Sequence, residues 1–472
     1  MIQIYNTLSR KKEEFKPIED GQIRMYLCGP TVYNYIHIGN ARSAVSFDTI
    51  RRYFEYRGFD VNYVSNFTDV DDKIINAAKE LHIDAPEVAN RFIEAFFEDT
   101  GALSVKRATC HPRVMDNIPE IIEFVEALIE HGYAYESDGD VYYHTKKFKD
   151  YGKLSGITID ELQIGASERL GEEDSDKKEE PIDFALWKKA KPGEISWDSP
   201  WGQGRPGWHI ECSTMARKYL GETIDIHAGG QDLTFPHHEN EIAQTEAVTG
   251  KTFANYWMHN GFVTMGDEKM SKSIGNVKLV KDLRKEYDPD VLRFFLATAH
   301  YRRPLTYSET ALADAKANIT HIKTAIGNGY HRLETAVDSL PDDPERKEQW
   351  DEYIIRFTKA MDDDFQTQNG ITIVYEMIRE LNRMLEEPEV SKETLEMMLN
   401  DLIEILAIFG IESLQMDEDL LDDEIEILIQ QREEARAAKE FEQADAIRDL
   451  LKEKGILLED TPQGIRWKRE QN

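Results

Sequence analysis

The stretch Tyr26-Leu27-Cys28-Gly29-Pro30-Thr31-Val32-Tyr33-Asn34-Tyr35-Ile36-His37-Ile38-Gly39-Asn40 joins two segments with regular patterns. Before it, residues 22–28 alternate enough between polar and apolar residues to predict a strand. After it, residues 40–57 place apolar side chains at helical spacing, and Gly58 follows where a glycine favours a helix end. Residues 61–64 predict a second strand, so this region is typical of a βαβ unit. In open parallel sheets, ligands bind at the carboxyl ends of the strands.

A second motif lies far downstream, where Lys269-Met270-Ser271-Lys272-Ser273 is followed by Ile274-Gly275-Asn276. A given five-residue string should occur by chance in roughly one chain of this length in several thousand. The shorter string around His37 and Asn40 is weak evidence by itself, because its residues recur by chance in unrelated chains. The alternative interpretation of residues 269–273 is a flexible basic surface loop.

The two motifs resemble the signature pair of class I aminoacyl-tRNA synthetases, which hold the phosphates of ATP while an amino-acid carboxylate attacks the α-phosphorus. The resemblance implies a HIGH-like motif over Pro30–Asn40 and a KMSKS motif over Lys269–Ser273. It implies catalytic roles for His37, Lys269 and Lys272, and ATP contacts from His37, Asn40 and Lys272. Asn40 departs from the family pattern, which usually has a second histidine there. Its amide can donate a hydrogen bond but cannot carry charge.

The composition limits the class of protein. The chain has 472 residues, 40% of them hydrophobic, which is enough for several domains with their own cores. It has no apolar run long enough to cross a bilayer, and its first residues lack the apolar core of a signal peptide. Only three cysteines occur, which is no disulfide framework. We therefore expect a cytoplasmic protein without membrane segments.

The net charge of −33, from 57 basic and 90 acidic residues, argues against general nucleic-acid binding. Basic residues nevertheless gather locally, in residues 269–303 and in the tail Arg466-Trp467-Lys468-Arg469. We hypothesise that a polyanion binds there while the rest of the surface repels it.

Two cysteines far apart in sequence have unusual neighbours. Cys28 ends the first strand, and Cys212 ends a run rich in Trp, His and Glu. Downstream, His237 and Glu241 are four residues apart on a predicted helix, and His238 and Glu241 are three apart, so either histidine shares a face with the carboxylate. Cysteine, histidine and carboxylate form a plausible Zn²⁺ shell, although two unrelated buried cysteines would give the same pattern. The spacing does not choose between the two histidines. The third cysteine, Cys110, has no such neighbours and is expected to be a small buried side chain.

Several longer strings resemble cysteinyl-tRNA synthetases, and the similarity covers essentially the whole chain. They are residues 26–33, Phe67-Thr68-Asp69-Val70-Asp71-Asp72-Lys73, Gly204-Arg205-Pro206-Gly207-Trp208-His209-Ile210-Glu211-Cys212, Phe235-Pro236-His237-His238-Glu239-Asn240-Glu241 and His300-Tyr301-Arg302. The resemblance implies one zinc ion per chain, with Cys28, Cys212, His237 and Glu241 as ligands.

A zinc ion suits this family because cysteine and serine differ by one atom. A soft metal binds a thiol as thiolate, whereas the pKa of an alcohol is far too high for the same loss of a proton. We therefore expect the substrate thiolate to bind the zinc directly. Selection at this step makes a separate editing domain unnecessary.

The resemblance also implies the remaining substrates and contacts. ATP with Mg²⁺, L-cysteine and tRNA(Cys) are the expected substrates, and a monomer is the expected state. The expected substrate contacts are Thr31, Thr68, Trp208, His227 and Asp232. Trp208 and His227 could equally be packed core residues.

The predicted fold class is α/β: a Rossmann-like parallel-sheet catalytic domain with an insertion, then a helical bundle and a small α+β C-terminal domain. Helices are expected over residues 236–248, 309–333, 344–362, 370–386, 391–409 and 424–453, and a small β segment over 455–467. The predicted division is 1–112 and 203–260 for the two catalytic halves, 113–202 for the insertion, 261–308 for the KMSKS-containing stem-contact region, 309–412 for the tRNA-binding bundle and 424–472 for the anticodon-binding domain.

Two other functions remain open from the sequence. A relative of the family joins cysteine to an amino sugar and resembles only the catalytic part, so residues 424–472 favour tRNA as the acceptor. A non-catalytic zinc- and nucleotide-binding regulator is the third interpretation.

Overall fold

The computed structural model describes residues 1–163, 176–266, 268–270, 275–338, 340, 343–412, 414, 423–438, 440–453, 456–461 and 464–469. These residues form two compact units. The first comprises Met1–Ile319, Ile354–Val374 and Ile405–Ile411, and the second comprises Thr320–Tyr353, Tyr375–Glu404 and Glu412–Asn472.

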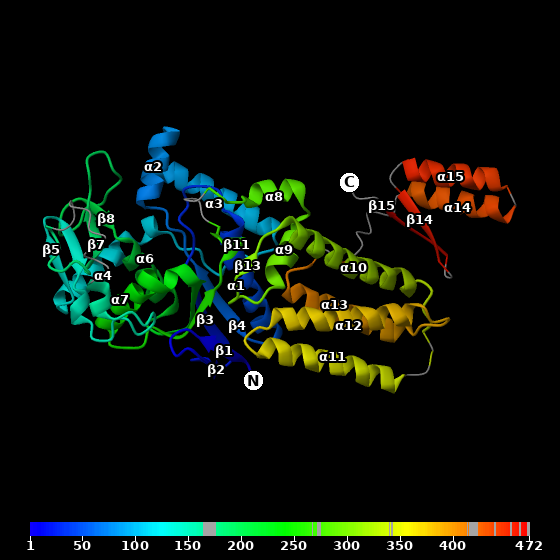
Figure 1. Cartoon of the computed structure of the whole chain (residues 1–472), viewed down its shortest axis with the longest axis horizontal. Helices are drawn as coiled ribbons and strands as arrows, with labels where there is room; N and C mark the ends of the chain where they lie inside the picture. The colour runs from blue at the N-terminus through cyan, green and yellow to red at the C-terminus, as the bar shows by residue number, and fades with distance from the viewer. Residues whose placement is uncertain are drawn as a thin grey trace. The chain divides into compact units, whose positions relative to one another are not determined.

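The central sheet of the first unit has four parallel strands in the order β10 (Ala254–Asn260), β9 (Ile224–Gly230), β3 (Gln22–Leu27) and β4 (Asp60–Ser65) (Figure 1). Helix α1 (Ile38–Tyr56) connects β3 to β4, which confirms the predicted βαβ unit. Six of the seven residues of β9 are buried, as expected for a parallel strand covered on both faces.

A second, antiparallel sheet contains β5 (Ala134–Ser137), β6 (Asp140–Tyr143), β7 (Phe184–Lys189) and β8 (Gly204–Pro206). It lies beside helix α4 (Ile118–Glu130) at the left of Figure 1. One hydrophobic core includes Trp187 of this sheet, Ile121 of α4 and Tyr26 of the central sheet. The two sheets are therefore parts of one packed body.

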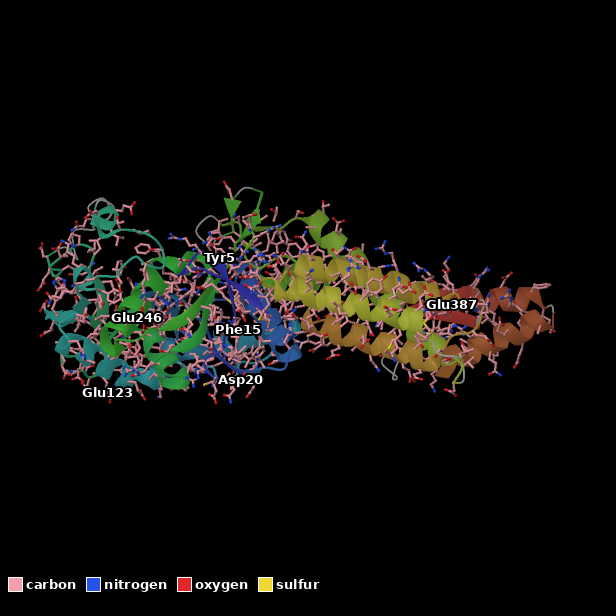
Figure 2. The ribbon with its side chains drawn as sticks, turned by 90° about the horizontal axis from the view of Figure 1, so that it is seen from below. Tyr5, Phe15, Asp20, Glu123, Glu246 and Glu387 are labelled. Carbon is pink, nitrogen blue, oxygen red and sulfur yellow. The ribbon has the colours of Figure 1, made fainter. Side chains whose placement is uncertain are left out.

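Further elements complete the first unit. They are β1 (Gln3–Asn6), β2 (Lys11–Glu14), α2 (Asp72–Leu81), α3 (Ala85–Ala102), α6 (Trp208–Leu220), α7 (Glu239–Thr249), α8 (Val280–Glu286), α9 (Pro289–Ala297) and a three-stranded sheet of β12 (Glu268–Lys269), β11 (Val263–Met265) and β13 (Leu305–Thr306). Phe15, labelled in Figure 2, ties the N-terminal hairpin to the core because its ring lies 5.2 Å from those of Phe54 and Tyr256.

The helix predicted from Pro236 is present, although its first turn is irregular. Thr234–His238 forms a π-helical segment in which only Phe235 is non-helical, and this segment continues into α7, which begins at Glu239. Phe235 has an extended backbone (φ −141°, ψ 133°). The ring of a proline disfavours helical angles in the residue before it, which explains why Phe235 is extended and the helical backbone starts at Pro236.

The helices predicted after residue 308 are present with small shifts: α10 (Glu309–Leu333), α11 (Pro344–Asp362), α12 (Thr367–Leu385) and α13 (Lys392–Ile408). The single helix expected over 424–453 is wrong, because two helices are found, α14 (Asp423–Ala437) and α15 (Phe441–Glu453). They pack on each other and, with β14 (Ile456–Thr461) and β15 (Gly464–Arg469), enclose a small core of Ile429, Ile447, Leu451 and Ile456. No helix in the described parts of the chain combines the length and apolar content that crossing a membrane requires.

A buried carboxylate joins three segments of the first unit. Asp364, with φ 55° and no exposed surface, accepts hydrogen bonds from the backbone N–H of Tyr5 (2.9 Å), the hydroxyl of Tyr301 (2.6 Å) and Nε of Arg302 (2.7 Å). Burial alone would raise the pKa of this carboxyl. Hydrogen bonds from His300, Tyr301 and Tyr5 and the charge of Arg302 outweigh burial and lower the pKa.

Replacing Asp364 by Asn should lower the free energy of unfolding at pH 7 by about 3 kcal/mol, because it leaves Arg302 without its buried partner. Asparagine tolerates a positive φ, so the substitution removes the charge and keeps the backbone conformation. The pKa of Asp364 is lower in the folded state than in the unfolded chain. The stabilisation that its charge provides is therefore present above the unfolded pKa of about 3.9 and is lost as the pH falls through the folded value. Urea unfolding followed by tryptophan fluorescence should show the two proteins converging below about pH 4.

The matched control is Asp363→Asn, since Asp363 is exposed and its carboxylate pairs with Lys12 at 2.7 Å. Its effect should stay within about 1 kcal/mol. Equal losses in both variants, or a difference that does not shrink in acid, would contradict this role of Asp364.

Candidate active site

Four side chains from distant parts of the sequence meet at the carboxyl end of the central sheet. Cys28 follows β3, Cys212 lies in α6, His237 lies in the turn before α7, and Glu241 lies in the first turn of α7. Cys28 Sγ is 3.7 Å from Cys212 Sγ and 3.4 Å from Glu241 Oε1. His237 Nε2 is 3.4 Å from Cys212 Sγ and 3.0 Å from Glu241 Oε1.

These distances fit a tetrahedral zinc ion. Bonds of about 2.3 Å to sulfur and about 2.0–2.1 Å to nitrogen or oxygen put two sulfurs about 3.8 Å apart and a sulfur and a nitrogen about 3.6 Å apart. The observed separations between Cys28 Sγ and Cys212 Sγ and between Cys212 Sγ and His237 Nε2 agree within about 0.2 Å. The donor set of two thiolates, an imidazole and a carboxylate is also one that zinc accepts.

A second possible metal-binding group fits less well. It consists of Cys28, His227, His238 and Glu241. His227 Nε2 is only 2.6 Å from Glu241 Oε2, a hydrogen-bond distance that is too short for two ligands of one ion. His238 Nε2 is 4.0 Å from the carboxylate, and its Nδ1 lies 2.8 Å from Nε2 of His259. The geometry therefore favours His237, which the spacing alone could not distinguish from His238.

The charges of the group also suit a cation. A hydrogen bond from Cys28 is the main cause that lowers the pKa of the Cys212 thiol to about 6. Burial would raise the pKa of Glu241, but the imidazoles of His227 and His237 lower it to about 2. Burial would lower the pKa of His237, but Cys212 and Glu241 raise it to about 10. A positive charge is thus stabilised where the thiolate and the carboxylate converge.

Neighbouring rings hold two of the four side chains in orientation. The Nδ1 atoms of His209 and His237 are 3.0 Å apart, so the neutral His209 ring can accept the Nδ1 proton of His237 and leave Nε2 for a metal. Burial lowers the pKa of His209 and keeps it neutral. His227 can donate to the second oxygen of Glu241. Trp208, 40% exposed, stacks on His237 with ring centroids 4.3 Å apart.

The backbone at Cys28 explains one motif residue. The N–H of Gly29 donates to Oδ1 of Asn66 (2.9 Å), and a Cβ at Gly29 would lie 1.5 Å from the carbonyl oxygen of Asn66. Only glycine fits this approach between the ends of β3 and β4. The same contact brings Thr31 and Thr68 together, in a parallel bridge between the two segments.

The HIGH-like motif caps α1. Nδ1 of His37 accepts hydrogen bonds from the backbone N–H groups of Gly39 (3.1 Å) and Asn40 (3.3 Å), and Oδ1 of Asn40 accepts from the N–H of His37 (3.2 Å). The helix therefore begins at Ile38, two residues before the predicted start. Because Nδ1 accepts, the proton of the neutral His37 ring is on Nε2. Asn40, in place of the second histidine, closes a capping box.

Lys269 and Asp232 come together although 37 residues separate them. Lys269 Nζ is 3.5 Å from Oδ2 of Asp232 and 4.0 Å from the ring centroid of Phe262. Met270 is buried. The other motif residues, Ser271, Lys272 and Ser273, lie outside the described residues.

Sequence reasoning missed three residues beside the candidate ligands: His209, His259 and Asn66. His209 stands three residues before Cys212 in the same motif string, and Asn66 directly precedes another string, which was the available signal. His259 gave no signal, because a histidine within the strand β10 has no distinctive spacing.

Comparison with known families divides the chain into three matched parts. Residues 14–317 match the class I (C) tRNA synthetase catalytic domain, residues 356–413 the DALR domain, and residues 418–467 the cysteinyl-tRNA ligase anticodon binding domain. A cysteine–tRNA ligase of Ligilactobacillus salivarius is 61% identical over 99% of this chain and all of its own length. One of Enterococcus faecalis is 62% identical over the full length of both proteins.

Solved structures show the same fold at low identity. The methionyl-tRNA synthetase of Mycobacterium tuberculosis, in complex with methionyl-adenylate, is 14% identical with a TM-score of 0.59, covering 82% of this chain and 89% of its own. The LeuRS of Agrobacterium radiobacter, in its ternary complex with tRNA and LeuAMS, is 12% identical with a TM-score of 0.64, covering 84% and 85%. Given the full-length identity to curated relatives and the matched catalytic domain, the chain belongs to the cysteine–tRNA ligase family of class I aminoacyl-tRNA synthetases.

Proposed function

We propose that the chain activates L-cysteine with ATP to cysteinyl-adenylate and transfers it to the 3′ end of tRNA(Cys), with zinc selecting cysteine over serine. The observation that carries the proposal is the convergence of two thiols, an imidazole and a carboxylate at zinc-like separations. It lies at the carboxyl end of the parallel sheet, where this class of fold binds its substrates.

Cys28, Cys212, His237 and Glu241 would hold one zinc ion per chain. When bound, zinc supplies a soft Lewis-acid centre that takes a thiol as thiolate and leaves a hydroxyl poorly bound. His209 and His227 orient two of the ligands through the contacts described above. Cys28 is the only one of the four that is not fully buried, so we expect the substrate to approach from its side.

Adenylate formation requires stabilisation of the negative charge that develops on the departing pyrophosphate. His37 Nε2 can donate at the N-terminus of α1, where the helix dipole also favours anions. Lys269 and Lys272 would supply positive charge, and Asn40 an amide donor. Mg²⁺ would accompany ATP.

We further propose Thr31, Thr68, Trp208 and Asp232 as contacts of the substrates. Thr31 and Thr68 lie side by side at the ends of adjacent strands, and Trp208 is exposed over His237, which supports this role. His227 has no exposed surface and contacts Glu241. We therefore propose that it acts on the substrate through that carboxylate.

The tRNA would contact the second half of the chain, following the division into a stem-contact region (261–308), a bundle (309–412) and an anticodon-binding domain (424–472). The matched anticodon binding domain supports tRNA as the acceptor and disfavours an amino sugar. We also propose a monomer located in the cytoplasm.

The full chain should catalyse ATP–pyrophosphate exchange that depends on cysteine, and should charge tRNA(Cys) when the tRNA is added. Exchange without charging would refute tRNA as the acceptor. Zinc binding without any exchange would refute the enzyme and leave a regulator.

Cys212→Ala should weaken zinc binding by at least about 10²-fold, because it removes a thiolate ligand from a buried site. The preference for cysteine over serine in pyrophosphate exchange should fall with the bound zinc, which is measured by elemental analysis of the purified protein. Wild-type protein stripped by a chelator should lose exchange and regain it with added zinc.

Cys110→Ala is the control, since this third cysteine is not among the residues grouped at the site. It should keep its zinc and its amino-acid preference. An active wild-type enzyme without metal, or an intact preference for cysteine in Cys212→Ala, would contradict the zinc assignment.

Lys272→Ala should lower kcat for cysteine activation by about 10²–10³-fold, because it removes a charge that stabilises the transition state. The KM for cysteine should change by no more than about twofold, because the lysine acts on the phosphates. Lys285→Ala, a change at an exposed lysine of α8, is the control. Unchanged pyrophosphate exchange in Lys272→Ala would contradict the assignment.

A further inference from the structure

Arg42 is a fully buried arginine one turn into α1, close to the helix end that carries His37 and Asn40. Its Nη1 donates to the carbonyl oxygen of Phe262 (2.8 Å), and its Nη2 donates to the carbonyl oxygens of His300 (3.0 Å) and Arg303. One guanidinium group therefore binds the backbone of two other segments of the first unit.

In the described part of the chain, the charge of Arg42 has no opposite partner. Among the described residues no carboxylate forms an ion pair with it, and its Nε is buried without a hydrogen-bond partner. Burial accordingly lowers its pKa to about 10, so the group stays charged at neutral pH. A buried charge that only dipoles compensate is unfavourable for folding. This cost suggests that the arginine serves the site and not only the core.

The two segments bound by Arg42 lead into the central strand and one edge strand of the small sheet that carries Lys269. Phe262 leads into β11, and β11 pairs with β12, in which Lys269 lies opposite Thr264. His300 and Arg303 lead into β13, which pairs with β11 through Val263 and Leu305. Phe262 also contacts Lys269 directly, because Nζ of the lysine lies 4.0 Å from the centre of its ring.

The backbone packing leaves little freedom at this junction. A Cβ at Gly261 would lie 2.7 Å from the carbonyl oxygen of Arg303, so the segment before β11 is in close contact with the segment before β13. The start of α1 is bound independently to the chain after the motif. Ile38 N–H donates to the carbonyl of Lys278 (2.9 Å), and Val280 N–H donates to that of Ile36 (3.1 Å).

We propose that Arg42 is a positioning residue for ATP, which fixes the Lys269-bearing sheet at a set distance from the His37 cap. The inference rests on the proposed function. His37 and Lys269 belong to different segments, and Arg42 bridges them with a planar fork whose two ends reach separate carbonyl groups. A lysine, as a single point donor, cannot span both. The substrate thiol and the metal ligands lie outside this bridge, so cysteine binding should not depend on it.

The experiment measures ATP and cysteine separately in Arg42→Lys and Arg42→Ala. In pyrophosphate exchange, KM for ATP should rise about tenfold and kcat should fall about 10²-fold, because a small misplacement of a reacting group has effects of this size. KM for cysteine and the zinc content should stay within about twofold of wild type. Adding low concentrations of guanidinium should partly restore the rate of pyrophosphate exchange in Arg42→Ala. The rate of wild type should not rise.

Arg293→Lys is the matched control. Arg293 is also fully buried and donates to the carbonyl oxygens of Phe409 (2.7 Å) and Leu103 (3.2 Å), but it pairs with Asp48 and contacts neither of the two segments. It should lower the melting temperature without changing KM for ATP. A merely structural role of Arg42 would lower stability in the same way, with no selective change for ATP and no rescue.

Direct binding of ATP to the variants, without cysteine, separates the two proposals. If the wild-type protein shows no pyrophosphate exchange, the proposed function is refuted. Weaker ATP binding in Arg42→Lys would still support the Arg42 bridge in that case. Unchanged affinity and KM for ATP in a folded Arg42→Lys, or a parallel loss for ATP and cysteine, would overturn the inference.

Discussion

The parallel pairing of β3 with both β4 and β9 is the constraint on which the site depends. The pairing continues past the strand, because the N–H of Cys28 donates to the carbonyl of Ala228 (3.2 Å), while Gly29 is held by Asn66 at the end of β4. Shifting β3 by one residue would turn Cys28 to the opposite face of the sheet. The buried residues on both faces prevent that shift. The register thus decides whether a thiol from the first strand can meet a carboxylate from α7.

Electrostatic interactions explain why the candidate metal ligands can lie together before any ligand binds. Burying Glu241 and the Cys212 thiolate is unfavourable, and the imidazoles of His227 and His237 offset it. Burial keeps two further imidazoles neutral, because it lowers the pKa of His238 and lowers that of His259 to about 3. His237 therefore carries positive charge beside two anions, and the rings of His209 and His238 next to it are neutral. A divalent ion can replace that positive charge without reorganising the surrounding rings.

The sequence predicted the elements whose signals are local. The βαβ unit followed from apolar periodicity and Gly58, and α10 and α11 have the predicted bounds. The break between α14 and α15 was missed, because no Gly or Pro stands between Ala437 and Phe441 and the apolar spacing continues across it. The choice of His237 over His238 depends on their distances to Cys212 and Glu241 in the folded chain, which spacing does not reveal. The bridge made by Arg42 joins segments more than 200 residues apart, and backbone carbonyl groups leave no pattern in a sequence.

Arg42 also bears on how so acidic a chain can bind a polyanion. A net charge of −33 repels ATP at long range, but exposed charges are screened by salt beyond about 8–10 Å. A buried guanidinium is screened far less, and none of the carboxylates that the structure describes pairs with it. An acidic partner for Arg42 would remove its attraction for the polyanion. Using backbone carbonyls in place of a carboxylate therefore keeps both the position and the charge.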